Sequence, residues 1–204
     1  RPDHSQRLAQ VHDQAERLER LDVHRVGARG AAHAVHDGLL RAGLLPRLTR
    51  NARHFHTLNI IRPERNPLLG ERGLANAICL ANEELGLMPV NLGEVKIMLE
   101  NGGAECFGKM LRNIQDAARH RLLGLPEGAP PPTLVLPVDQ SEELFGSDAT
   151  EEARNFLELI GTVLRSSLRE SGGTGLSLIV AFTIRSDRYE PLQTAQELMG
   201  LKTV

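Results

Sequence analysis

The stretch Thr133-Leu-Val-Leu-Pro-Val-Asp-Gln-Ser-Glu-Glu-Leu-Phe145 decides the fold of this chain. It opens with a short apolar run that follows three prolines, and this pattern predicts a strand buried on both faces. Asp139 ends the run, and two further carboxylates follow at Glu142 and Glu143. Because ligands of open α/β sheets gather at the carboxyl ends of the strands, we expect these acids to lie at a binding edge.

Carboxylates at the end of such a strand can take part in binding a metal ion and a nucleotide. A carboxylate there can bind Mg²⁺, directly or through water, against the phosphates of a nucleotide, and a second acid can orient the attacking water. Asp139 followed by Glu142 and Glu143 has this Walker B arrangement. The alternative interpretation is a buried strand followed by a solvated acidic turn, and the pattern alone does not separate the two.

The rest of the chain alternates helices with further strands. Residues 176–184 form a second buried apolar run with Arg185 at its carboxyl end, and residues 55–61 alternate as a strand does. Strands separated by helices indicate parallel βαβ units and an α/β fold, so Asp139 and Arg185 should share one edge. The apolar spacing predicts helices over residues 4–21, 39–48 (ended by Pro46), 74–85, 91–99, 104–122, 148–169 and 190–199. Asn91 with Glu94 three residues on predicts a capping box, and Ser147 or Asp148 is expected to cap the long helix that ends near Arg169.

Composition limits the classes of function. A hydrophobic fraction of 41% allows a normal core, and a net charge of -2 without a basic block argues against nucleic-acid binding. The longest apolar run, residues 176–184, is too short to span a bilayer. Cys79 and Cys106 lack metal-site spacing and indicate thiols in a reducing compartment, so we expect a cytoplasmic location. His33 and His36 have no evident third metal ligand.

Four segments together resemble one family. They are Leu39-Leu-Arg-Ala-Gly-Leu-Leu-Pro-Arg-Leu48, Ile61-Arg-Pro-Glu-Arg65, the stretch from Leu134 to Phe145, and Phe182-Thr-Ile-Arg-Ser-Asp187. From about Gly38 onward the chain resembles the novel STAND class of P-loop NTPases. The resemblance implies a three-layer P-loop NTPase-like parallel sheet flanked by helices, incomplete at both ends. It divides the chain into residues 1–37, an N-terminal helix and atypical segment, and residues 38–204, a partial NTPase domain.

The resemblance also implies an activity and partners. Members bind and hydrolyse ATP with Mg²⁺ inside large signalling proteins, often bacterial, between an effector domain and sensor repeats, and oligomerise in the active state. Carried over by position, Asp139 would hold Mg²⁺ and the nucleotide. Glu142 or Glu143 would position water, and Arg185 would sense the γ-phosphate. Neither nucleic acid nor a membrane span is expected.

The sequence departs from the family at the phosphate loop. Residues 30–38, Gly-Ala-Ala-His-Ala-Val-His-Asp-Gly, replace the family's Gly-x-x-Gly-x-Gly-Lys-Ser-Ser. His36 takes the place of the Lys and Asp37 that of the metal-binding hydroxyl, so we expect impaired ATP binding. The alternative function is a non-catalytic pseudo-NTPase or interaction module that keeps only the sheet. A further hypothesis is a change of reading frame just before Gly38.

Other charged residues have plainer interpretations. Arg62, Glu64 and Arg65 are interpreted as a solvated loop, and Asp187 as a partner of Arg185 or Arg188.

Overall fold

The computed structural model describes residues 39–124, 128–145, 149–169 and 175–201, all within one compact unit. The predictions for residues 1–37, including the first helix, His33, His36 and the phosphate-loop segment, lie outside these residues. The predicted boundary between residues 37 and 38 therefore stays a prediction.

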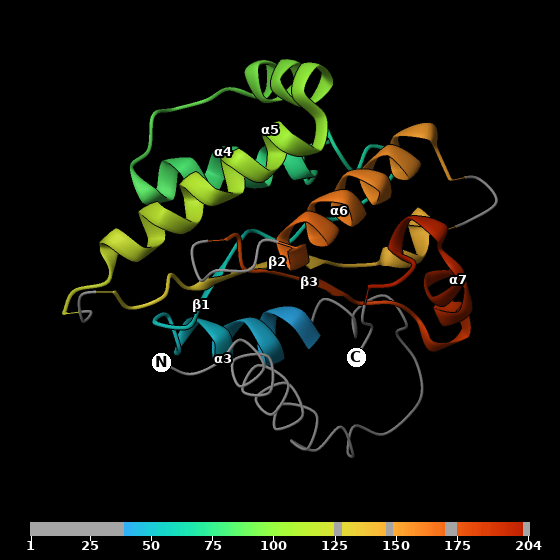
Figure 1. Cartoon of the computed structure of the whole chain (residues 1–204). Coiled ribbons are helices and arrows are strands. Elements are labelled where there is room, and N and C mark those ends of the chain that lie inside the picture. Colours follow the sequence, from blue (N-terminus) through green and yellow to red (C-terminus); the bar gives the residue numbers. More distant parts are fainter. Residues whose placement is uncertain (1–38, 125–127, 146–148, 170–174, 202–204) are drawn as a thin grey trace. The chain divides into compact units, whose positions relative to one another are not determined.

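Three parallel strands form the sheet, in the order β1-β2-β3 (Figure 1). They are β1 (Phe55–Thr57), β2 (Thr133–Val138) and β3 (Leu178–Phe182). Val138 at the end of β2 pairs with Phe182 at the end of β3. The two predicted strands are therefore parallel neighbours, as expected, and the residues that follow them meet at one edge of the sheet. The expectation that both are buried holds for β2 but is wrong for β3, whose five residues are all half-buried.

Strand β1 ends earlier than predicted because of Pro137 in the central strand. Thr57 pairs with Val135 and Ile61 with Val138, so four steps along one strand match three along the other, a bulge of one residue. Pro137 faces β1, since its carbonyl accepts a hydrogen bond from the Ile61 N–H at 2.9 Å. Having no N–H itself, Pro137 cannot bond the opposing strand there, and the ladder is interrupted.

Helices cover both sides of the sheet (Figure 1). Three of them lie together on one side: α4 (Leu74–Leu85), α5 (Leu92–Arg121) and α6 (Glu151–Arg169). On the other side a π-helical turn, η1 (Leu39–Leu44), leads into α3 (Leu45–Thr49). Together with the parallel sheet, this arrangement confirms the α/β, P-loop NTPase-like fold class.

The buried side chains alternate between these two sides. Leu134, Leu136 and Val138 belong to the large core cluster shared with α4, α5 and α6, whereas Val135 is buried outside it. Successive residues of a strand point to opposite faces, so β2 is buried on both faces, as its unbroken apolar run predicted.

Two helix predictions need correction. Pro46 was expected to end a helix, but it lies in the first turn of α3, where its missing N–H would have no helical partner anyway. The helix expected over residues 190–199 is divided at Ala195, whose backbone is not helical, into α7 (Tyr189–Thr194) and the 3₁₀ turn η4 (Gln196–Leu198). The prediction of two helices on either side of residues 101–103 is confirmed, because α5 consists of two helices joined at a kink where Gly103 has the non-helical angles φ 48° and ψ -137°. The predicted capping box at the start of α5 is confirmed, with Asn91 and Glu94 each accepting the other's backbone N–H at 2.9 Å.

Helix α6 is fixed at its start and in its middle. The Thr150 hydroxyl accepts the Ala153 N–H at 3.1 Å and so caps the helix, whereas the predicted caps at residues 147 and 148 lie outside the described residues. Gly161 lets the backbone of η4 (Gln196–Leu198) approach closely, because a Cβ there would lie 2.1 Å from the Glu197 carbonyl oxygen. The chain reaches η4 from β3 through η3 (Ser186–Arg188) and α7 (Tyr189–Thr194).

Candidate functional site

Asp139 lies where β2 ends, at the carboxyl edge of the sheet. Its backbone N–H donates to the Ile61 carbonyl at 2.9 Å, so the residue after the bulge holds it on one side. The residue is fully buried. A buried carboxylate is costly unless it is hydrogen-bonded and paired with a positive charge, so its partners decide whether the arrangement is stable.

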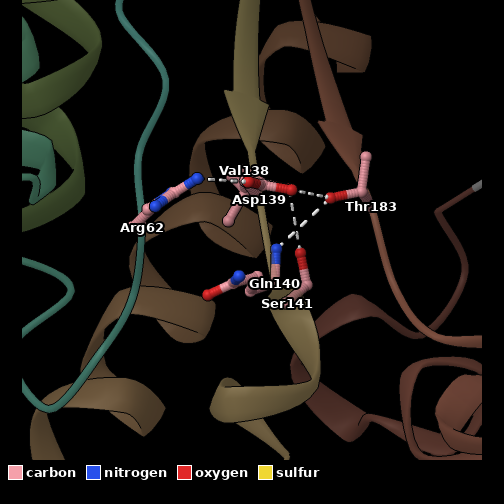
Figure 2. Close-up of polar contacts among 6 residues, drawn as sticks. All are labelled: Arg62, Val138, Asp139, Gln140, Ser141 and Thr183. Carbon is pink, nitrogen blue, oxygen red and sulfur yellow. Dashed lines mark hydrogen bonds and ion pairs between the residues drawn. The ribbon is translucent and has the colours of Figure 1, made fainter. Parts of the chain in front are cut away.

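Two side chains satisfy the Asp139 carboxylate, as Figure 2 shows. The Thr183 hydroxyl, from the segment after β3, donates to Oδ1 at 2.5 Å. The Arg62 guanidinium, from the loop after β1, donates to Oδ2 at 3.3 Å. Asp139 thus joins the ends of all three strands, and each of its oxygens has a protein donor.

The turn after Asp139 is fixed by the same threonine. Gln140 has a left-handed backbone with φ 57°, which turns the chain away from β2. The Gln140 N–H donates to Thr183 Oγ1 at 3.3 Å, and the Ser141 N–H donates to the Thr183 carbonyl at 2.9 Å. The Ser141 hydroxyl donates back to the Val138 carbonyl at 3.1 Å. Thr183 therefore orients both the carboxylate and the turn that follows it.

The loop of residues 62–73 is anchored at several points. The Arg62 N–H donates to the Arg72 carbonyl at 2.9 Å, which closes the loop on itself. Glu152 Oε1, in the first turn of α6, accepts the N–H groups of Leu68 and Leu69 at 3.0 and 2.9 Å. These bonds fix the backbone from which the Arg62 side chain reaches Asp139.

Glu142 and Glu143 lie in the short helix η2 (Ser141–Leu144), in different surroundings. Glu143 is exposed, whereas Glu142 is half-buried and its Oε2 has no hydrogen-bond partner among the described residues. Partial loss of water raises the pKa of the Glu143 carboxyl, and the nearby Glu142 charge adds to this effect. A hydrogen bond with the Glu64 backbone and the charge of Arg62 act in the opposite direction.

Arg185 lies at the predicted edge but not in the Asp139 cluster. Its Nε and Nη2 donate to the two carboxylate oxygens of Asp187, both at 3.2 Å. Both side chains are more than half exposed, at 51% and 57%, so this pair contributes little to stability. The predicted pairing of Asp187 with Arg185 is confirmed, and Arg185 can exchange this partner at low cost.

Comparison with known families decides the assignment. The family described as Novel STAND NTPase 1 matches residues 7–203, nearly the whole chain. This chain belongs to the Novel STAND NTPase 1 family. No significant match was found among curated proteins or solved structures. No helix in the described part of the chain is long and apolar enough to cross a membrane.

Membership in the Novel STAND NTPase 1 family makes this an NTPase-type domain, for which nucleotide and Mg²⁺ binding are general properties. The resemblance was expected to begin at about Gly38, but the match starts at residue 7. The change of reading frame just before Gly38 stays a hypothesis.

Asp139 is the carboxylate at this edge that could hold Mg²⁺, but its two oxygens already accept hydrogen bonds from Thr183 and Arg62. Asp139, Thr183 and Ser141 bring a carboxylate and two hydroxyls to one edge, and Mg²⁺ on a nucleotide needs only one or two protein carboxylates. No group of three or more His, Cys, Asp or Glu residues that could hold a metal occurs in the described ranges. A single carboxylate of this kind could take part in a metal site shared with the phosphates of a nucleotide once one of its present donors moves away.

Sequence reasoning missed two members of this cluster. Thr183 lies in a quoted motif, and pairing β2 with β3 in register would have placed it beside Asp139. Arg62 was interpreted as part of a solvated loop, which is wrong, because its side chain is only 16% exposed and is paired with Asp139. The position of Arg62 depends on the bulge opposite Pro137, which no local pattern indicates.

Proposed function

We propose that this domain is an ATP-binding and hydrolysing switch of a STAND-type signalling protein, impaired in this chain at the phosphate loop. The observation that supports the proposal is a buried carboxylate, Asp139, directly after the central parallel strand of a domain in an NTPase family. Carboxyl ends of parallel strands are where α/β proteins bind nucleotides.

Each residue at the edge has a role in this proposal. Bound Mg²⁺ would neutralise charge on the β- and γ-phosphates. Asp139 would hold the metal, directly or through water, and Thr183 would keep the Asp139 carboxylate oriented. Arg185 would leave its exposed partner Asp187 and contact the γ-phosphate.

Two acids compete for the role of positioning the attacking water. Glu143 is exposed and can reach a ligand without rearrangement, whereas Glu142 has a buried oxygen that lacks a hydrogen-bond partner among the described residues. A water molecule bound at that oxygen would satisfy it. Both residues therefore stay candidates, and single Gln substitutions at each position separate them by the loss of hydrolysis without loss of binding.

The phosphate-loop segment argues for weak binding. His36 and Asp37 replace the Lys and the hydroxyl that contact the phosphates and Mg²⁺ in the family. A hydrogen bond to a charged group contributes roughly 1.5–3 kcal/mol, so the loss of two such bonds should lower the affinity for ATP about a hundredfold or more. We further propose a cytoplasmic, multidomain parent with effector and sensor parts that oligomerises when active.

Titration calorimetry with Mg·ATP on the full chain tests this function. We expect weak binding that Asp139→Asn abolishes. Asp116→Asn, which removes an exposed carboxylate of α5, is the matched control and should leave binding unchanged. Equal binding by wild type and Asp139→Asn would contradict the assignment of the site.

A second function is favoured by one feature of the same site. Both Asp139 oxygens have protein donors, so the edge is stable without any ligand. A non-catalytic pseudo-NTPase or interaction module would keep the sheet in this form. A well-folded chain that binds no Mg·ATP, even when His36→Lys and Asp37→Ser restore the family residues, would favour this alternative.

A further inference from the structure

Arg62 is the more exposed of the two side chains that donate to the Asp139 carboxylate. Thr183 and Asp139 are buried, at 7% and 0% exposure, whereas the Arg62 side chain is 16% exposed. Arg62 also lines an open depression of about 310 Å³ formed by its own loop, together with Asn66, Gly70 and Arg72. Part of the Arg62 side chain therefore reaches solvent, although its Nε is buried.

The Asp139 carboxylate has no exposed surface at which a metal could bind while both donors stay in place. Its Oδ1 is held by the short hydrogen bond from Thr183, inside the sheet. Its Oδ2 is held by the longer contact with Arg62, at 3.3 Å. The contact at Oδ2 is the longer of the two and involves the more exposed donor, so it is the contact that a competing cation would displace more easily.

We infer that Arg62 is a built-in counter-cation and that a divalent cation must displace it from Asp139 Oδ2 in order to bind. This inference rests on the proposed function, because it assigns the metal to Asp139. The two cations are alternatives at one carboxylate oxygen, because the guanidinium lies against Asp139 Oδ2, where the metal would have to bind. Arg62 thus lowers the affinity for metal and keeps the empty edge stable.

Displacement of Arg62 would also change the electrostatic environment of the Glu143 carboxyl. The Arg62 charge favours the ionised form of the Glu143 carboxyl, so the guanidinium lies within electrostatic reach of both acids. The Arg62 backbone is fixed by its bond to the Arg72 carbonyl, so the movement is confined to the side chain. The depression beside the loop gives that side chain room to move.

Thermal unfolding of the full chain with and without Mg²⁺, at constant ionic strength, tests the competition. Arg62→Met should unfold at a lower temperature than wild type without Mg²⁺, and Mg²⁺ should raise its midpoint more than that of wild type. The apparent Mg²⁺ affinity of Arg62→Met should be about tenfold or more higher, because one charge-assisted hydrogen bond no longer competes. Arg72→Met removes an exposed arginine of the same loop and should respond as wild type does.

Two further variants keep the test decisive. Asp139→Asn in the Arg62→Met background should abolish the response to Mg²⁺. If Arg62→Met does not fold, Arg62→Lys keeps a charge without the planar fork of donors and should give an intermediate gain in Mg²⁺ affinity. Equal Mg²⁺ responses of wild type and the Arg62 variants would overturn the inference.

The same proteins distinguish this failure from failure of the proposed function. Mg·ATP binding that depends on Asp139 but is identical in wild type and Arg62→Met would leave the function intact and remove the competition. No response to Mg²⁺ or Mg·ATP in either protein would contradict both.

Discussion

Polar side chains close both ends of the β2–β3 pair, but the two ends use different chemistry. At the amino end, buried Gln115 of α5 donates to the Pro132 and Ser177 carbonyls at 2.9 and 3.3 Å, and the hydroxyls of Thr133 and Ser177 lie 2.9 Å apart. Every one of these groups is neutral. At the carboxyl end the central group is the charged Asp139, paired with a cation.

The two ends differ in what their polar groups contribute to the stability of the fold. Neutral hydrogen bonds satisfy buried backbone groups without the cost of removing a charge from water. A buried ion pair often contributes no more stability than apolar residues of the same volume. The proposed Mg²⁺ site would explain why a charged group stands at the carboxyl end.

The largest expected effect comes from breaking the charged end on one side. Arg62→Met leaves Asp139 buried without its cation and should lower the free energy of unfolding by about 3 kcal/mol. Adding Asp139→Asn removes the charge as well and should restore most of that loss. Urea unfolding of the single and double variants measures both, and additive losses would show that the pair is not coupled.

The neutral end should be nearly as sensitive but unrelated to ligands. Gln115→Leu leaves two carbonyls without their side-chain donor and should lower the free energy of unfolding by about 2 kcal/mol. Mg·ATP binding by the folded fraction should not change. Asn113→Leu, an exposed position on the same helix, is the control and should cost much less.

Thr183 tests how far the carboxyl end depends on orientation. Thr183→Val keeps the shape of the side chain but removes the hydroxyl. It should lower the free energy of unfolding by about 1.5 kcal/mol and weaken the binding of Mg·ATP. Thr183→Ser retains the hydroxyl and should retain most of both. If Val and Ser behave alike in binding, the hydroxyl has no role in orienting Asp139.

The smallest expected effect is a pH dependence confined to the charged end. The raised pKa of Glu143 means that the folded state holds its proton more tightly than the unfolded state does. Stability should therefore fall slightly as pH rises from the ordinary glutamate pKa through the raised one. Urea unfolding of wild type and Glu143→Gln at a series of pH values measures this effect. Glu143→Gln should remove the fall in stability and be slightly more stable than wild type at neutral pH. Glu151→Gln, at an exposed glutamate of α6, is the control for the loss of a charge.

Local pattern was enough to predict the elements with strong periodicity. The predicted helix over residues 74–85 matches α4, and the two apolar runs became adjacent parallel strands with Asp139 and Arg185 at one edge. The capping box at Asn91 was also visible, because it involves residues only three apart. Each of these features depends on neighbours in the sequence or on a general rule of sheet topology.

The errors arose where distant residues decide the structure. The early end of β1 depends on Pro137, and the role of Arg62 depends on a partner 77 residues away. The prediction for Pro46 was wrong because proline can end a helix or lie in its first turn, and here α3 begins just before it, after η1. The choice between Glu142 and Glu143 is likewise absent from the sequence, because their exposure depends on packing around η2.

Pro137 has a consequence for how the strands find one another during folding. A slip of one residue between β2 and β3 would move the side chains of β2 to opposite faces. It would also turn the missing N–H of Pro137 toward β3, where the correctly paired strands need a continuous ladder. Pro137 therefore disfavours misaligned pairing of β2 with β3. In the correct alignment, the backbone hydrogen bond that Pro137 cannot make is lost only on the β1 side, at the bulge that places Arg62 beside Asp139.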